Sequence, residues 1–134
     1  MDGEVRVLVS GSRECDVGEV EELVRGVFGG LAAHAADQDA RVVIITGGAR
    51  GVDEVAMQVA AEMLFTVVTV FPQWNTAPVR KRAALDRNIE MLERWSPDYV
   101  LCFDAGTNGT GHQRSQAEAR GIPVRTYPIR KVAS

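Results

Sequence analysis

The chain has 134 residues, of which 46% are hydrophobic and 25% charged, and its formal net charge at pH 7 is -3. These values predict a single globular domain over residues 1–134, and they exclude the bulk basic charge that attracts nucleic acid or an anionic membrane surface. No segment approaches the roughly 20 consecutive apolar residues that cross a bilayer, so we expect no membrane contact and a cytoplasmic protein. Cys15 and Cys102 fit two reduced thiols, although the sequence leaves one disulfide bridge open.

The predicted elements alternate between short β-branched strands and longer segments with a helical spacing of apolar residues. In chain order they are a strand at 5–9, a helix with apolar residues from Val20 to Leu31, a strand at 41–46, a helix from Val52 to Met63, a strand at 66–71, a helix within 79–95, a strand at 99–103, a helix at 113–120 and a strand at 124–127. Asp16 and Glu19 resemble a capping box for the first helix. Three residues of the third helix are expected to face the sheet: Leu85, Ile89 and Leu92. Residues 130–134 are expected to be a frayed end.

This βαβαβαβαβ order predicts a three-layer α/β fold of the Rossmann-like kind, with a parallel sheet of five strands in the order 3-2-1-4-5 and helices on both faces. Open sheets of this kind bind ligands beyond the carboxyl ends of the strands, where the strand order reverses. Here that point lies between the first and fourth strands. Four unusual loops follow the first four strands and therefore belong to this edge: residues 10–13, 47–51, 73–75 and 106–111.

The segment from Thr46 to Asp53 is typical of an anion-binding turn. Its sequence is Thr-Gly-Gly-Ala-Arg-Gly-Val-Asp, and it connects a predicted strand to a predicted helix. Glycine lets the backbone approach a ligand closely, and a helix start offers unpaired N–H groups and a partial positive charge. Phosphate is the natural ligand of such a turn. The alternative is a tight turn in which the glycines only satisfy backbone geometry.

Six short motifs are spread over nearly the whole chain. They are Val-Ser-Gly-Ser-Arg at 9–13, Thr-Gly-Gly-Ala-Arg-Gly-Val-Asp at 46–53, Phe-Pro-x-Trp at 71–74, Arg-Asn-x-x-Met at 87–91, Pro-Asp at 97–98 and Gly-Thr at 109–110. In this combination the chain resembles the SLOG superfamily, a Rossmann-like group related to the Lonely-Guy proteins, and most closely its YspA/cpYpsA-related branch. The resemblance implies a nucleotide-related ligand, because the superfamily includes phosphoribohydrolases, nucleotide sensors and DNA-processing proteins.

The resemblance also implies two catalytic positions. In the hydrolases an arginine comes from an Arg-Lys-x-x-Met-like segment, which Arg87 matches, and a glutamate lies three residues after the threonine of a glycine-rich loop. Counting three from Thr110 reaches Gln113. A neutral amide does not stabilise the positive charge that glycosidic cleavage develops on the sugar, so Gln113 argues against ordinary hydrolase activity. Asp104 or Glu118 could substitute, but the spacing singles out neither.

The candidate ligand-binding residues come from the loops and the third helix: Gly11, Ser12, Arg13, Gly47, Gly48, Arg50, Gly51, Asp53, Arg87, Asn88, Gly109, Thr110, Gly111 and His112. Asp53 is first of all a first-turn acid that stabilises the helix N-terminus, and second a ligand for a ribose hydroxyl. Trp74 could contact a base, the sheet edge or a partner chain. No metal or other cofactor is expected, because no cluster of His, Cys, Asp and Glu has metal-ligand spacing.

The leading hypothesis is a module that binds a nucleotide or nucleotide-derived small molecule, with its phosphates held by the loops at 47–51 and 109–111. The alternative is a phosphoribohydrolase that cleaves the N-glycosidic bond of a nucleoside 5'-monophosphate. A second alternative is an accessory protein in nucleic-acid processing, although the net charge opposes nucleic-acid binding. We expect a homo-oligomer, most simply a dimer.

Overall fold

The computed structural model describes residues 3–71, 80–106 and 108–132. It contains one parallel sheet of five strands in the order β3-β2-β1-β4-β5. The strands are β1 (Gly3–Gly11), β2 (Ala40–Thr46), β3 (Thr66–Thr69), β4 (Tyr99–Asp104) and β5 (Val124–Pro128). The helices are α1 (Val17–Asp37), α2 (Val52–Glu62), α3 (Arg80–Trp95) and α4 (Asn108–Ala119). The predicted α/β Rossmann-like fold and strand order are confirmed.

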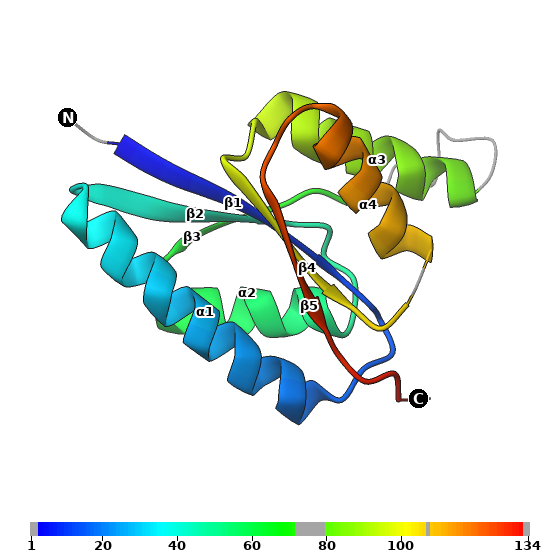
Figure 1. Ribbon diagram of the computed structural model, residues 1–134, viewed down its shortest axis with the longest axis horizontal. Coiled ribbons are helices and arrows are strands. Elements are labelled where there is room, and N and C mark those ends of the chain that lie inside the picture. The colour runs from blue at the N-terminus through cyan, green and yellow to red at the C-terminus, as the bar shows by residue number, and fades with distance from the viewer. Residues whose placement is uncertain (1–2, 72–79, 107, 133–134) are drawn as a thin grey trace.

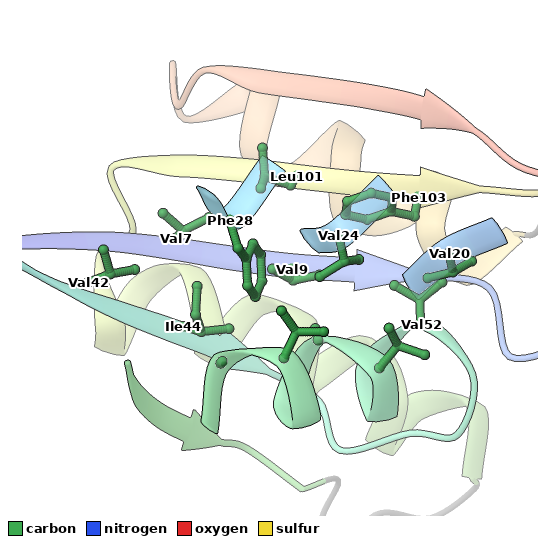
Figure 2. Packing of buried hydrophobic residues seen from close by; sticks show 14 of the residues in the cluster. Val7, Val9, Val20, Val24, Phe28, Val42, Ile44, Val52, Leu101 and Phe103 are labelled. Atoms are coloured by element: carbon green, nitrogen blue, oxygen red, sulfur yellow. The ribbon is translucent and has the colours of Figure 1, made fainter. Parts of the chain in front are cut away.

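The sheet lies between two layers of helices (Figure 1), with α1 and α2 on one face and α3 and α4 on the other. Successive residues of a strand point to opposite faces, so each strand supplies both layers. In β1, Val7 and Val9 pack with Phe28 of α1, whereas Leu8 belongs to the cluster beneath α3 and α4. Figure 2 shows the first of these clusters, where Val20, Val24 and Phe28 cover the valines and isoleucine of the central strands.

The strand order reverses at β1, which pairs with β2 on one side and with β4 on the other. Its last residue, Gly11, lies against the start of α2, because a Cβ at this position would come within 2.5 Å of the Val52 side chain. A glycine at the end of β1 therefore allows α2 to begin close to the sheet. This contact fixes the edge at which the crevice described below opens.

The first helix begins where the sequence predicts. Asp16 is its N-cap, and its Oδ1 accepts a hydrogen bond from the Glu19 N–H at 3.2 Å. Such a cap satisfies one of the N–H groups that a helix start leaves unpaired. Among the described residues, no helix has the length and apolar character needed to cross a membrane.

The fourth helix begins at Asn108, five residues before the predicted start at position 113. Gly109 and Gly111 therefore belong to its first turn and not to a free loop. Because glycine has a low helix propensity, the local sequence pattern predicts a start for α4 that is too late in the chain. Thr110 and Gln113 are buried against the rest of the fold, and their burial favours the earlier helix start.

Two further expectations are corrected, and a third is not tested. Strand β3 ends at Thr69 rather than at residue 71. On α3, Leu85 and Ile89 are only half-buried, whereas Asn88 is buried because its side chain has hydrogen-bonding partners. The expected loop at 72–78, with Trp74, lies outside the described residues.

The segment after β5 is not frayed up to residue 131. The Ile129 N–H donates to the Asp104 carbonyl at 3.1 Å. Arg130 pairs with Asp16 at 2.6 Å and with Glu19 at 3.5 Å, which fastens the segment to the start of α1. This attachment brings Lys131 to the edge of the sheet that carries the crevice.

Candidate functional site: a cationic crevice at the strand ends

A cavity of about 790 Å³ opens at the carboxyl ends of the central strands. The end of β1, the turn between β2 and α2, the middle of α3 and the first turns of α4 all contribute to its wall. The lining residues are Val9, Ser10, Gly11, Arg13, Glu14, Gly47, Ala49, Arg50, Asp53, Ala84, Leu85, Arg87, Asn88, Met91, Thr110, His112 and Lys131. The cavity therefore lies at the predicted reversal of strand order.

The turn between β2 and α2 is held against the loop after β1. The Val52 N–H donates to the Ser12 carbonyl at 3.2 Å. Gly51 has a φ of 81°, and a Cβ there would lie 2.5 Å from the Arg13 carbonyl oxygen. Only glycine suits both the left-handed backbone and this close approach. The Gly51 N–H donates to the Glu54 carboxylate at 3.2 Å, so one N–H at the helix start is already paired.

Arg87 reaches across from α3 to this turn. Its Nη1 donates to the Gly47 carbonyl at 2.8 Å, and a Cβ on Gly47 would collide with the guanidinium group. The absence of a side chain at Gly47 thus makes room for Arg87. Burial lowers the pKa of Arg87, whereas the nearby Asp53 raises it and Arg13 lowers it further. The guanidinium group is a partly desolvated cation, which strengthens its interaction with an anion.

A chain of hydrogen bonds connects Arg87 to α4. Arg87 Nε donates to Asn88 Oδ1 at 3.2 Å, so the Asn88 amide nitrogen is turned toward His112 Nδ1, 3.1 Å away. Because that nitrogen donates, His112 Nδ1 accepts and the ring proton lies on Nε2. Burial, followed by the charge of Arg120, lowers the pKa of His112. The ring is therefore a neutral N–H donor on the cavity wall at pH 7.

Asp53 is the second residue of α2 and lies on the cavity wall, yet it is only 6% exposed. Its Oδ2 accepts a hydrogen bond from the Ala49 N–H at 3.2 Å. Burial raises the pKa of this carboxyl group to about 6, although the N–H groups of Ala49 and Gly47 and the charges of Arg87 and Arg13 act in the opposite direction. Asp53 is thus a first-turn acid, as the sequence suggested first, and it also lines the cavity.

The crevice as a whole carries a positive charge. Among the described lining residues, four are basic and two are acidic: Arg13, Arg50, Arg87, Lys131, Glu14 and Asp53. Arg50 lies 3.9 Å from Glu14, and its side chain is 60% exposed, so this pair neutralises little of the positive charge. A concave site with excess positive charge suits an anionic ligand even though the chain has a net charge of -3.

Nine of the predicted residues meet at this cavity: Gly11, Arg13, Gly47, Arg50, Asp53, Arg87, Asn88, Thr110 and His112. The other predicted residues are not among the lining residues. Ser12 Oγ accepts a hydrogen bond from the Ala105 N–H at 2.9 Å, and Gly48 with a φ of 70° lies against Phe71. Gly51 shapes the turn as described above, and Gly109 and Gly111 belong to the first turn of α4.

Gln113 is fully buried and is not among the cavity-lining residues. Its Nε2 donates to the Asn88 carbonyl at 3.2 Å, so this side chain links α4 to α3. Asp104 also has a structural role, since it pairs with Arg114 at 3.2 Å and accepts from the Gly106 N–H at 2.7 Å. Glu118, the other suggested substitute, is exposed and also absent from the lining.

Sequence reasoning missed several lining residues, of which Glu14, Met91 and Lys131 are the most informative. Glu14 directly follows the predicted Arg13, and Met91 lies one helical turn after Arg87, so both had a signal in the spacing. Lys131 had none, because only the attachment of the C-terminal segment brings it to the cavity. The described residues contain no group of three or more His, Cys, Asp or Glu side chains arranged to hold a metal ion.

No protein-family model matches the chain. A curated relative, Gene 61 protein of Mycobacterium phage D29, is 35% identical over 123 residues, which cover 89% of this chain and 93% of that protein. The solved structure of TM1055, a structural genomics target, superposes with a TM-score of 0.66 at 23% identity over 92% of this chain and 72% of TM1055. DNA processing protein A (DprA) from Streptococcus pneumoniae superposes with a TM-score of 0.66 at 18% identity over 90% of this chain and 49% of DprA. At these identities the two structures show a shared fold.

Proposed function

The chain belongs to the family of Gene 61 protein of Mycobacterium phage D29, and from the crevice that its fold builds we propose that it binds a nucleotide or a nucleotide-derived ligand. The observation that carries the proposal is the position of Arg87 over the glycine-rich turn at the start of α2. A guanidinium group beside a helix N-terminus combines charge, directed donors and dipole at one place. A phosphate group is the ligand that uses all three.

The size and lining of the cavity support a nucleotide rather than phosphate alone. Its volume of about 790 Å³ falls in the range of small-molecule sites. Val9, Ala84, Leu85 and Met91 add apolar surface beside the charged groups. A ligand with an anionic part and a less polar ring is the kind of molecule that such a mixed wall accommodates.

Hydrolysis of an N-glycosidic bond is a weaker candidate. The position that should carry the catalytic glutamate holds Gln113, which lies behind the cavity wall, and Asp104 is engaged with Arg114. DNA handling is weaker too, because a net charge of -3 gives no general attraction to a phosphate backbone. The fold shared with DprA does not change this, since one fold carries many functions.

The finer assignments belong to the same proposal. We infer from the motifs that the chain is a SLOG-type domain of the YspA/cpYpsA-related branch, that residues 1–134 act as one domain and that the protein works in the cytoplasm. A homodimer is part of the proposal, and sedimentation velocity of the purified protein checks it. A single species with the 14.5 kDa mass of the chain would contradict it.

Titration calorimetry tests the proposed function with AMP, ADP-ribose and cyclic nucleotides as probes. We expect the wild type to bind at least one of them, and Arg87→Ala to weaken that binding by about tenfold or more, because a hydrogen bond to a charged group is lost. The matched control is Arg82→Ala, which removes an exposed arginine of the same helix that pairs with Asp86 at 3.3 Å. It should leave the affinity unchanged.

Two outcomes would count against the proposal. The first is absence of binding by the whole panel at millimolar concentration. The second is equal weakening by Arg87→Ala and Arg82→Ala, which would indicate a general charge effect. Circular dichroism of each variant shows whether the fold is intact, and Arg13→Ala offers a second cavity variant at an exposed position. Free base released from AMP during the incubation would favour the hydrolase alternative.

A further inference from the structure

One oxygen of the Asp53 carboxyl group lacks a partner. Oδ2 accepts from the Ala49 N–H, but Oδ1 is buried and has no hydrogen-bond partner among the residues that the structure describes. Buried polar atoms are almost always paired, so an exception on a cavity wall needs an explanation. Asp53 lines the cavity, so a bound molecule would lie beside this carboxyl group.

The cationic donors of the crevice do not satisfy Oδ1. Arg87 directs Nη1 to the Gly47 carbonyl and Nε to Asn88 Oδ1, and Arg13 is exposed. Both arginines act on Asp53 through their charge, without a hydrogen bond to Oδ1. The Gly47 N–H lowers the pKa of this carboxyl group but makes no hydrogen bond to Oδ1, so a donor of the bound molecule can take that place.

The chemistry of that donor follows from the charges around it. A phosphate dianion has only acceptor oxygens, so it is repelled by a carboxylate and does not donate to it. An uncharged hydroxyl group can donate, and a hydrogen bond to a charged acceptor is among the stronger ones. The cationic residues of the same cavity, Arg13 and Arg87, suit the anionic part of the molecule.

We infer that Asp53 Oδ1 accepts a hydrogen bond from a hydroxyl group of the bound molecule, so that the crevice selects phosphate esters of polyols, ribose phosphates among them, over phosphates that lack the hydroxyl. This inference rests on the proposed function and narrows it. Under this inference Asp53 contacts the ligand. It distinguishes a sugar that carries a hydroxyl group from an analogue that has a hydrogen atom at the same position. A site built around an unpaired buried acceptor rejects an analogue without the donor, because the acceptor then stays unpaired.

The test compares AMP with 2',3'-dideoxyadenosine 5'-monophosphate, which keeps the base and the phosphate but lacks both ring hydroxyls. In the wild type we expect AMP to bind about tenfold more tightly. In Asp53→Asn the amide oxygen can take over the Ala49 N–H, which turns the amide nitrogen toward the cavity. That nitrogen is a donor, so the preference for AMP should fall below about threefold.

The matched control is Glu62→Gln, which removes one carboxylate from the same helix at an exposed position, where it pairs with Arg25 at 2.7 Å. It should keep the wild-type preference. Equal affinities of the wild type for the two nucleotides would overturn the inference and leave the proposed function standing. If neither nucleotide binds at millimolar concentration, both are overturned. An unchanged preference in a folded Asp53→Asn variant would also overturn the inference.

A second measurement needs no variant. The two nucleotides carry the same phosphate, so its titration cancels in the ratio of their affinities. Arg87 from α3 and Arg13 from the loop after β1 act on Asp53 through their charge, Glu54 is exposed on its own helix, and Glu14, Arg50, His112 and Lys131 also line the cavity. The pKa of Asp53 is raised to about 6, so protonation at pH 5 removes the charged acceptor. The preference for AMP should therefore shrink between pH 8 and 5, and a constant ratio would overturn the inference.

Discussion

Gly47 and Arg87 are 40 residues apart in the chain, yet the position of each depends on the other. The glycine leaves the space that the guanidinium group fills, and the guanidinium group binds the carbonyl of that glycine. The same logic applies to Gly51, where the carbonyl of Arg13 occupies the place of a side chain. At the scale of single residues, the glycine-rich turn therefore serves the packing of its neighbours.

Asp53 makes a prediction about stability. Its pKa in the folded state is raised to about 6 from the usual value of 3.8, so between these values the folded protein holds a proton that the unfolded chain has released. The free energy of unfolding should then fall as pH rises from about 4 to 6, by about 3 kcal/mol in total for this group. Urea denaturation of the wild type and of Asp53→Asn at several pH values measures this contribution. It is the difference between the free energies of unfolding of the two proteins at each pH.

The direction in which stability changes with pH distinguishes Asp53 from acids that are paired with a basic residue. Glu4, for example, is half-buried and has a lowered pKa because Arg41 and Arg6 donate to it, so its contribution to stability is lost when the pH falls. Subtracting the Asp53→Asn data removes such shared contributions. A wild type whose stability relative to this variant rises with pH would contradict the raised pKa.

At the scale of elements, α1 contains glycines that the fold does not require. Gly29 is exposed in the middle of the helix, and a Cβ there would meet no atom within 4 Å. Gly51, at the start of α2, has no such freedom because its φ is 81° and the Arg13 carbonyl is 2.5 Å from the Cβ position. Two glycines that look alike in the sequence thus differ in what they contribute.

Substitution by alanine should separate them. Gly29→Ala is expected to raise the free energy of unfolding by about 0.5–1 kcal/mol, because alanine loses less backbone entropy in a helix. Gly51→Ala is expected to lower it by about 1–3 kcal/mol, because the left-handed backbone is strained for alanine and the carbonyl must move. Urea denaturation of both variants measures the two changes. A destabilising effect of Gly29→Ala would contradict the prediction, because it would show that a side chain at this exposed position of α1 meets other atoms.

At the scale of the whole molecule, a parallel sheet covered on both faces places its central residues out of reach of solvent. Cys102 in β4 is fully buried, and burial raises the pKa of its thiol to about 11. Cys15 is also buried, and burial with the charges of Asp16 and Glu19 raises its pKa. Both thiols are free in the structure, as the sequence predicted.

Thiol labelling therefore reports opening of the sheet. In Cys15→Ser, we expect Cys102 to react with Ellman's reagent at least about 10³-fold more slowly in the folded protein than in denaturant, because reaction requires unfolding. A spectrophotometric time course at fixed pH measures both rates. Prompt and complete labelling of Cys102 in the folded protein would contradict the burial of β4.

The sequence by itself determined the architecture. Apolar spacing in β1 and β2, the helix stripe of α1 and the glycines at each strand exit predicted a 3-2-1-4-5 sheet with its ligand edge between β1 and β4. These features follow from local periodicity and from topological rules, so they need no knowledge of distant contacts. The ligand edge carries the cavity, and most predicted site residues line it.

Only the tertiary structure decided which polar residues face the cavity and how they are charged. Asp53 and Gln113 both lie near helix starts and each has one buried side-chain oxygen that is unpaired among the described residues, yet Asp53 lines the cavity whereas Gln113 links α4 to α3 outside the lining. Lys131 lines the cavity, and its neighbour Arg130 pairs with Asp16, more than a hundred residues earlier in the chain. Desolvation and contacts between distant segments produce these differences, and neither leaves a periodic signal in the sequence.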